Sequence, residues 1–465
     1  MTGAPAVRRP LTLIAVLAVL LSAAAAPPGH TATDPARTPG TPAYTVELRS
    51  DATGAHWRGH ERIAFTNTSA EPMDEVYLRL WDNAHGGCAA PAVRVSGLDG
   101  PYGVGCTALR VPLPHPLRRG DSGALEFDLA IDVPDGADRF GRDGAFYFLG
   151  NALPVLAVRD AAGWHLDPYT DNGESFFALV SDYAVTLDHP TGVLVPATGT
   201  AVDGPGAPGR TITKLTARQV REFAWAAGPF SRIEGRSPGG VRVAVHSATN
   251  VTAKDARHVL DLSLASVDAL STRYGAYPYG ELDVVVDNAF SFGGMEYAAF
   301  VLDRVRPSAV VHEVAHQWWY GIVGDDQYRT PWLDESFAEY AMDLALNDIG
   351  EPGDPSDDGG PGGLGHAGED CADLPPWQSV DERLTNPMRY WDAHPDRYGP
   401  VVYDRGSCAL HDLSGLIGPE TMATLLHDYA RAHWYGVSTT ADFKAAAQAA
   451  ASVDLAPFWR EHRID

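Results

Sequence analysis

The hydrophobic and polar residues follow different patterns in the two halves of the chain. From Tyr44 to about Arg236, apolar residues come in short, often alternating runs that Gly, Pro and Asp separate. Alternation with a period of two is typical of strands that bury one face. The runs at 44–48, 76–80, 124–133 and 183–187 therefore predict an N-terminal antiparallel β-domain, a β-sandwich or saddle, over residues 43–235.

After residue 236, strand-like and helix-like patterns follow one another. A strand-like run at 241–247 precedes a long amphipathic stretch at 252–274, and a second strand-like run at 281–287 precedes several helical segments. This mixture predicts an α+β domain over residues 236–465, and thus an α+β multidomain chain. Residues 351–370 are rich in Gly, Pro and Asp, and we expect them to form an acidic loop between two helices.

The first 42 residues have the pattern of an export signal and a leader. Arg8 and Arg9 precede an apolar run at 11–21 and small residues at 22–26, which predicts a cleaved signal peptide over residues 1–26. An uncleaved anchor is the alternative, although the apolar run is short for a membrane span. Residues 27–42 contain little that is apolar and are expected to be a flexible leader. We therefore expect a secreted, extracellular protein with no stable membrane insertion after cleavage.

The charge balance removes one class of partner. The 465 residues include 35 Lys and Arg against 60 Asp and Glu, a formal net charge of −25. Phosphate backbones need clustered cations. No nucleic-acid partner is therefore expected.

The four cysteines are expected to form two disulfides, because an even count after an export signal is typical of an oxidising compartment. Three pairings are open, and buried free thiols are the alternative. We favour neighbours in sequence, Cys88 with Cys106 and Cys371 with Cys408, because each pair closes a modest loop within one predicted domain.

The stretch VVHEVAHQWW carries the first candidate chemistry. His312 and His316 are four residues apart, so on a helix both imidazoles can reach one metal ion from the same face. Glu313 lies beside the first histidine, and most of the surrounding residues are apolar. A solvent-facing polar helix is a poor explanation of this pattern, because the polar groups would be buried without a function.

A third metal ligand is expected on another helix, in the stretch TPWLDESFAEYAMDL. Glu335 would complete a set of two histidines and one glutamate, which is the arrangement of catalytic zinc sites that leave the fourth position to water. We expect one Zn²⁺ per chain. Glu339 lies one turn beyond Glu335, where it could orient a ligand or face the solvent.

The motif HEVAH, followed after 18 residues by Glu335, resembles the gluzincin metallopeptidases of the aminopeptidase N and leukotriene hydrolase family. The stretches WHLDPYTDNGESFF and REFAWAAGPF look like that family's N-terminal β-domain. The resemblance implies a thermolysin-like catalytic domain at 236–465. Few residues follow Tyr403, so we expect a short form that lacks the family's C-terminal helical domain and has a more open cleft.

Two further stretches are similar to family motifs. SFGGMEYAAF is similar to the exopeptidase motif Gly-x-Met-Glu-Asn, with Tyr297 in place of Asn. The resemblance implies that its first four residues bind the N-terminal end of a peptide; these are Gly293, Gly294, Met295 and Glu296. VVYDRGSCAL resembles the segment in which Tyr403 would be the transition-state tyrosine.

Together these features predict a secreted zinc aminopeptidase that acts on peptides with a free N-terminus. Glu313 is expected to act as general base toward a zinc-activated water, and Tyr403 to stabilise the oxyanion. Glu296 would bind the α-amine, and Glu174 is a further candidate by position. A gluzincin endopeptidase without an amine anchor is one alternative, and a non-catalytic zinc-containing binding protein is another.

Overall fold

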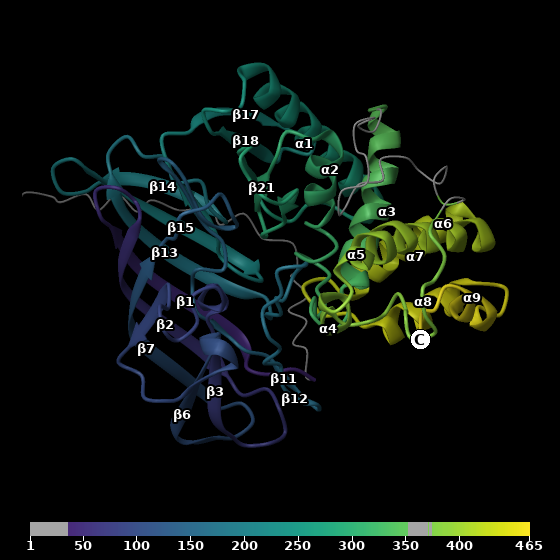
Figure 1. Cartoon of the computed structure of the whole chain (residues 1–465), viewed down its shortest axis with the longest axis horizontal. Coiled ribbons are helices and arrows are strands. Elements are labelled where there is room, and N and C mark those ends of the chain that lie inside the picture. Colours follow the sequence, from purple (N-terminus) through teal and green to yellow (C-terminus); the bar gives the residue numbers. More distant parts are fainter. Residues whose placement is uncertain (1–35, 352–370, 372–373) are drawn as a thin grey trace, which may run out of the picture. The chain divides into compact units, whose positions relative to one another are not determined.

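The computed structural model describes residues 36–351, 371 and 374–465. Contacts divide the chain into residues 1–31 and 32–465, and all described residues belong to the second unit. The predicted signal peptide at 1–26, most of the predicted leader at 27–42 and almost all of the predicted acidic loop at 351–370 lie outside the described residues. The predicted succession of a β-rich half and an α+β half is confirmed (Figure 1).

A seven-stranded sheet is the main element of the N-terminal half (Figure 1). In β1, the side chains of Tyr44, Val46 and Leu48 are buried, while those between them are exposed, as the alternation predicted. Neighbouring strands are antiparallel except β1 and β13, which pair in parallel. In sheet order the strands are β14 (Thr200–Pro205), β15 (Arg210–Val220), β13 (Ser181–Pro190), β1 (Gly40–Ser50), β2 (His56–Thr66), β7 (Ser122–Asp132) and β4 (Val93–Ser96).

A four-stranded sheet packs against the apolar face of the large one. Residues of both sheets form one hydrophobic core. Its order is β10 (Val155–Leu156), β3 (Met73–Arg79), β6 (Ala108–Leu117) and β5 (Tyr102–Gly103). Smaller elements complete this half: β8 (Phe140–Asp143), β9 (Phe146–Leu149) and β16 (Trp225–Ala227) in one sheet, the pair β11 (Arg159–Asp160) and β12 (Gly163–Trp164), and the 3₁₀ turns η1 (Trp81–Ala84) and η2 (Val104–Cys106).

Residues 38–42 differ from the flexible leader that the composition predicted. The main chain of Thr38 exchanges two hydrogen bonds with Arg159, at 2.9 and 2.7 Å, and β1 already begins at Gly40. Backbone pairing thus orders a segment that has little apolar surface to bury.

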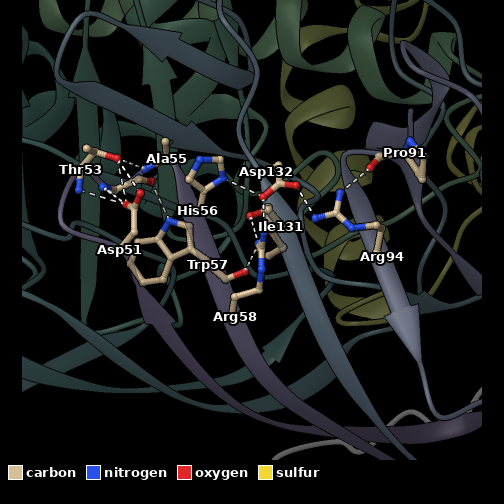
Figure 2. A network of polar contacts seen from close by, with 11 residues as sticks. Asp51, Thr53, Ala55, His56, Trp57, Arg58, Pro91, Arg94, Ile131 and Asp132 are labelled. Carbon is tan, nitrogen blue, oxygen red and sulfur yellow. Dashed lines mark hydrogen bonds and ion pairs between the residues drawn. The ribbon is translucent and has the colours of Figure 1, made fainter. Parts of the chain in front are cut away.

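An ion-pair network joins three neighbouring strands of the large sheet (Figure 2). Asp132 of β7 lies 2.6 Å from Arg58 and 2.7 Å from His56, both of β2, and it also pairs with Arg94 of β4. Partial burial opposes the charge of Asp132, but its hydrogen bonds to Arg58, Arg94 and His56 lower its pKa to about 2. Because these side chains are partly exposed, the network adds little to stability.

The sheet of the C-terminal half has five strands. Its order is β17 (Ser231–Arg236), β18 (Arg242–Ser247), β19 (Glu281–Val286), β21 (Phe300–Asp303) and β20 (Gly294–Met295). The three inner strands are parallel and the two outer ones antiparallel to their neighbours. β17 begins five residues before the predicted domain boundary at 236 and pairs with β18 of this sheet. The edge strand β20 carries two residues of the Gly-x-Met-Glu motif.

Helices bury their apolar faces with this sheet in a second hydrophobic core (Figure 1). They are α1 (Ala253–Tyr274), α2 (Pro307–Ala315), α3 (Trp332–Ile349), α4 (Met388–Asp392), α5 (Pro395–Tyr398), the π-helix η4 (Gly399–Arg405), α6 (Gly406–Ile417), α7 (Pro419–Ala432), α8 (Thr440–Ala450) and α9 (Ala456–Glu461). Within the described ranges, no helix combines the length and apolar character needed to cross a membrane.

Both predicted disulfides are confirmed. Cys88 is bonded to Cys106, with 5.2 Å between their Cα atoms, and Cys371 to Cys408, with 5.6 Å. The first closes a loop within the β-rich half, and the second attaches the segment before α4 to helix α6.

The guanidinium of Arg221 connects the two halves. Arg221 follows β15, is only 1% exposed and donates hydrogen bonds to four main-chain carbonyl oxygens. One acceptor is Ala178 of the N-terminal half, and the others belong to Tyr320, Ile322 and Gly436 of the C-terminal half. A buried guanidinium is tolerated there because carbonyl dipoles replace its water shell.

We expect Arg221→Met to lower the free energy of unfolding by about 3 kcal/mol or more, because it leaves several buried carbonyl oxygens without a donor. The measurement is urea unfolding followed by circular dichroism. Arg218→Met is the matched control, since Arg218 has a 77% exposed side chain that lies 3.6 Å from Asp182. Equal midpoints for the two variants would contradict the structural role of Arg221.

Candidate active site and metal centre

The three predicted metal ligands meet at one point. His312 lies in the last turns of α2 and His316 caps its end, while Glu335 lies in the first turn of α3. The Nε2 atoms of the two histidines are 2.9 Å apart, and Oε2 of Glu335 is 3.2 Å from each of them. All three side chains are buried. The spacing of four residues on a helix therefore does bring both rings to one side.

This donor set fits a zinc ion. Two imidazole nitrogens and a carboxylate oxygen are the donors of catalytic zinc sites. With metal–ligand bonds of about 2.0–2.1 Å, ligand atoms of a tetrahedral site are about 3.3 Å apart. The observed separations of 2.9–3.2 Å lie close to that value. Burial opposes the charge of Glu335, but His316 and His312 hold its pKa well below the usual range, so Glu335 is an anion.

Two carboxylates contact the far nitrogens of the histidines. Nδ1 of His312 lies 2.8 Å from Oε2 of Glu339, and Nδ1 of His316 lies 2.8 Å from Oδ1 of Asp334. Such contacts orient the ring with Nε2 toward the centre, and the main-chain oxygen of Trp319 also lies 3.0 Å from Nδ1 of His316. Glu339, which was open to two interpretations, is 1% exposed and therefore supports His312. Asp334 was not predicted.

Glu313 lies beside this centre, where strand β20 passes close to its carboxylate. A Cβ atom at Gly294 would lie 2.2 Å from Oε1 of Glu313, so the glycine leaves the space that this side chain occupies. One ligand atom each of Glu313, Glu296 and His316 falls within 4.8 Å of the other two. Burial raises the pKa of Glu313 to about 7, as suits a group that takes up and releases a proton.

The Gly-x-Met-Glu stretch lies along the same side of the centre. Glu296 is 3% exposed, and its Oε1 accepts a hydrogen bond of 2.8 Å from Nε2 of Gln327. Burial raises the pKa of Glu296 well above the usual range. Met295 is buried, whereas a Cβ atom at Gly293 would meet nothing within 4 Å. Space is thus open beside the first glycine of the motif.

Tyr297, which replaces the asparagine of the family motif, serves the contact between the two halves. Its hydroxyl donates a hydrogen bond of 2.9 Å to Oδ1 of Asn151. A Cβ atom at Gly150 would lie 1.9 Å from that hydroxyl oxygen, so the ring packs directly against the glycine. Tyr297 thus makes a structural contact, while the neighbouring Glu296 remains in the site.

Tyr403 lies next to the first histidine. It belongs to the π-helix η4, and its ring is stacked on that of His312 with 5.8 Å between the centroids. Burial raises the pKa of Tyr403 well above the usual range, and the charge of Glu335 adds to the effect. The hydroxyl is therefore protonated and able to donate a hydrogen bond.

Glu174 reaches the centre from the N-terminal half. Its Oε1 lies 3.2 Å from Nη1 of Arg139, and both side chains are 12% exposed. Burial and the charges of Glu335 and Glu296 raise the pKa of Glu174. Position in the sequence alone had suggested this residue. Its partner Arg139 was not predicted, because no motif connects residues so far apart.

A second group of possible metal ligands, His165, Asp167 and Asp326, is better described as an ion-pair network. The two ring nitrogens of His165 lie 2.9 Å from Asp160 and 2.6 Å from Asp326. Nε of Arg329 lies 2.9 Å from Asp167. Arg329 thus already pairs with both carboxylates, because the same Nε lies 3.7 Å from Asp326.

Comparison with known proteins assigns this arrangement to a family. The family model described as the peptidase family M1 domain matches residues 260–462, which contain the three ligands, Glu313 and Tyr403. Residues 260–462 of this chain are thus similar to peptidase family M1. The resemblance to the gluzincins of the aminopeptidase N family is therefore confirmed.

Curated relatives align with part of this chain. Aminopeptidase N of Oryctolagus cuniculus is 23% identical over 323 residues, which cover 61% of this chain and 33% of that protein. Aminopeptidase N of Lactobacillus delbrueckii subsp. lactis is 25% identical over 250 residues, which cover 50% of this chain and 29% of that protein. The chain thus spans a third or less of the length of these relatives.

Solved structures share the fold over nearly the whole chain. The M1 zinc metallopeptidase from Deinococcus radiodurans has a TM-score of 0.66 at 19% identity and covers 90% of this chain and 93% of that one. A variant of that protein bound to a Tyr-Ser-Ala substrate has a TM-score of 0.65 at 19% identity, with coverages of 91% and 94%. The succession of a β-rich half and an M1 half is therefore a known architecture.

We expect His312→Ala, His316→Ala and Glu335→Ala to abolish zinc binding, because each removes one of three converging ligands. The measurement is zinc content by plasma mass spectrometry after purification and dialysis. Glu313→Gln is the matched control and should retain zinc, since Glu313 is adjacent to the ligands and is not one of them. Full zinc content in any of the three alanine variants would remove that residue from the ligand set.

Proposed function

We propose that the chain is an exported zinc aminopeptidase that releases N-terminal residues from peptides. The observation that carries the proposal is the buried carboxylate of Glu296, whose Oε1 accepts from a neutral amide close to Glu313 and the three ligands. A peptide ammonium group would supply the opposite charge there. Export is proposed from the pattern of residues 1–26 alone.

The residues of the site divide the chemistry among them. Glu296, with Glu174, would hold the α-amine and so place the first peptide bond next to the centre. Glu313 would accept a proton from the attacking water and pass it to the leaving amine. The Tyr403 hydroxyl would donate a hydrogen bond to the developing oxyanion. Bound to His312, His316 and Glu335, Zn²⁺ would contribute Lewis acidity.

The decisive experiment is a mass-spectrometric time course on the peptide Tyr-Ser-Ala and on its N-acetylated form, with zinc and with a chelator. We expect the free peptide to lose its first residue in the presence of zinc, and the acetylated form to be stable. Glu296→Gln should reduce kcat/KM for the free peptide by about 100-fold, because one charge-assisted bond is lost. Internal cleavage of longer peptides in both free and acetylated forms would instead indicate an endopeptidase. Bound zinc without hydrolysis would indicate a binding protein.

For Tyr403→Phe we expect kcat to fall by about 100- to 1,000-fold at unchanged zinc content, because one oxyanion donor is removed. Steady-state kinetics on the free tripeptide, together with metal analysis, test this. Tyr390→Phe is the matched control and should keep wild-type turnover. Tyr390 lies in α4, and its ring stacks on that of His394 with 4.3 Å between the centroids. Wild-type turnover in Tyr403→Phe would exclude the tyrosine from the mechanism.

A further inference from the structure

Gln327 connects two functional groups of the site that are far apart in the sequence. It lies in the segment that joins α2 to α3 in the sequence, and its side chain is fully buried. From one nitrogen, Nε2, it donates hydrogen bonds of 2.8 Å to Oε1 of Glu296 and of 2.6 Å to Oδ2 of Asp334. The other oxygen of Asp334 lies 2.8 Å from Nδ1 of His316. A continuous chain of polar contacts therefore runs from the candidate amine anchor to a candidate zinc ligand.

The orientation of this amide follows from its neighbours. A primary amide nitrogen carries two N–H donors, and here each of them faces one carboxylate oxygen. The reverse orientation would place the amide oxygen against two acceptors. Without a donor between them, Glu296 and Asp334 would repel each other inside the protein. Gln327 thus satisfies both carboxylates at once.

The turn that carries Gln327 is itself fixed. The main-chain oxygen of Asp326 accepts hydrogen bonds from the backbone of Arg329 and of Thr330, at 3.0 and 2.7 Å. The carboxylate of Asp326 lies 2.6 Å from the ring of His165, which belongs to the N-terminal half. A side chain held on such a turn can hold its partners in one place.

A different buried amide fixes the backbone of the Gly-x-Met-Glu segment. Nε2 of Gln317 donates to the carbonyl oxygens of Glu296 and Tyr297, at 3.3 and 3.2 Å, and its Oε1 accepts from the backbone of Ala299 at 2.8 Å. The backbone of Glu296 therefore depends on Gln317, while its carboxylate depends on Gln327. This division makes the contribution of Gln327 separable by mutation.

We propose that Gln327 is a positioning residue that sets the carboxylate of Glu296 for the peptide amine and the carboxylate of Asp334 for His316. The peptide part of this inference rests on the proposed aminopeptidase function, and the metal part does not. The removal of one amide should therefore weaken both peptide binding and zinc binding, although Gln327 contacts neither ligand itself.

Two double-mutant cycles test the proposal, with Gln327→Met as the central variant because methionine has a similar length and no N–H donor. Zinc affinity is measured by chelator competition on Gln327→Met, Asp334→Asn and the double variant. Affinity for Tyr-Ser-Ala and its acetylated form is measured by calorimetry on zinc-loaded Glu313→Gln protein that carries Gln327→Met, Glu296→Gln or both.

We expect Gln327→Met to weaken zinc binding by about tenfold or more, as variants of groups behind a metal ligand commonly do. We also expect it to weaken binding of the free peptide by about tenfold and to leave that of the acetylated form unchanged. Each double variant should have the same affinity as the single variant Asp334→Asn or Glu296→Gln from which it is made, because that single change has already broken the chain of contacts. Gln327→Glu, which keeps the shape and replaces the donor by an acceptor, repeats the test if the methionine variant does not fold.

Other outcomes would overturn the proposal. Three results would show that Gln327 does not position both Glu296 and Asp334. The first is a zinc or peptide affinity within twofold of the parent protein, and the second is an effect that simply adds in the double variants. The third is a change in zinc affinity alone or in peptide affinity alone. Asn83→Leu controls for general destabilisation: this buried amide donates to the main chain of Val93 in the N-terminal half and should leave both affinities unchanged. If the parent protein bound the free and the acetylated peptide equally well, the proposed aminopeptidase function would be wrong, and so would the role of Gln327 in peptide binding. The double-mutant cycle on zinc affinity would then still decide the role of Gln327 in metal binding.

Discussion

Two imidazole nitrogens and a carboxylate oxygen lie within 3.2 Å of one another inside this protein, and a bound zinc ion would lower the cost of burying them together. The surrounding structure also holds the segment that carries Tyr403 next to helix α3. A Cβ atom at Gly406 would lie 2.0 Å from the hydroxyl oxygen of Ser336, so glycine allows α6 to approach α3 closely. The same hydroxyl donates to the main chain of Val402 in η4, which holds the π-helix that carries Tyr403 against α3.

The N-terminal half takes part in this arrangement through side chains that cross to the C-terminal half. Arg221 donates hydrogen bonds to three main-chain carbonyl oxygens of the C-terminal half. His165 pairs with Asp326 in the turn that carries Gln327, and Asn151 accepts a hydrogen bond from the Tyr297 hydroxyl. Glu174 adds a carboxylate to the site itself. The β-rich half is therefore a structural component of the site. We expect substitutions at these contacts to displace the residues that bind the substrate in the proposed function.

Local patterns in the sequence predicted what local geometry determines. Spacing on one helix predicted His312 and His316, alternation predicted the strands, and short loops predicted both disulfides. The family resemblance supplied Glu296 and Tyr403. The parallel pairing of β1 with β13 and the bridge made by Gln327 depend on tertiary contacts, which leave no periodic signal. Asp334, beside Glu335 in the sequence, was missed because the orientation of a helical residue toward His316 becomes visible only after packing.

The charge balance connects the metal and the substrate. Six carboxyl groups lie in or beside the site, those of Glu174, Glu296, Glu313, Asp334, Glu335 and Glu339. The cationic groups that contact them are His312, His316 and Arg139. Burial raises the pKa of five of these groups, those of Glu174, Glu296, Glu313, Asp334 and Glu339, so protons can neutralise part of the negative charge when no other cation is bound. A divalent ion and a peptide ammonium group would each lower the cost of burying these carboxylates. In the proposed function, these carboxyl groups would favour a peptide ammonium group over a neutral, acetylated peptide end.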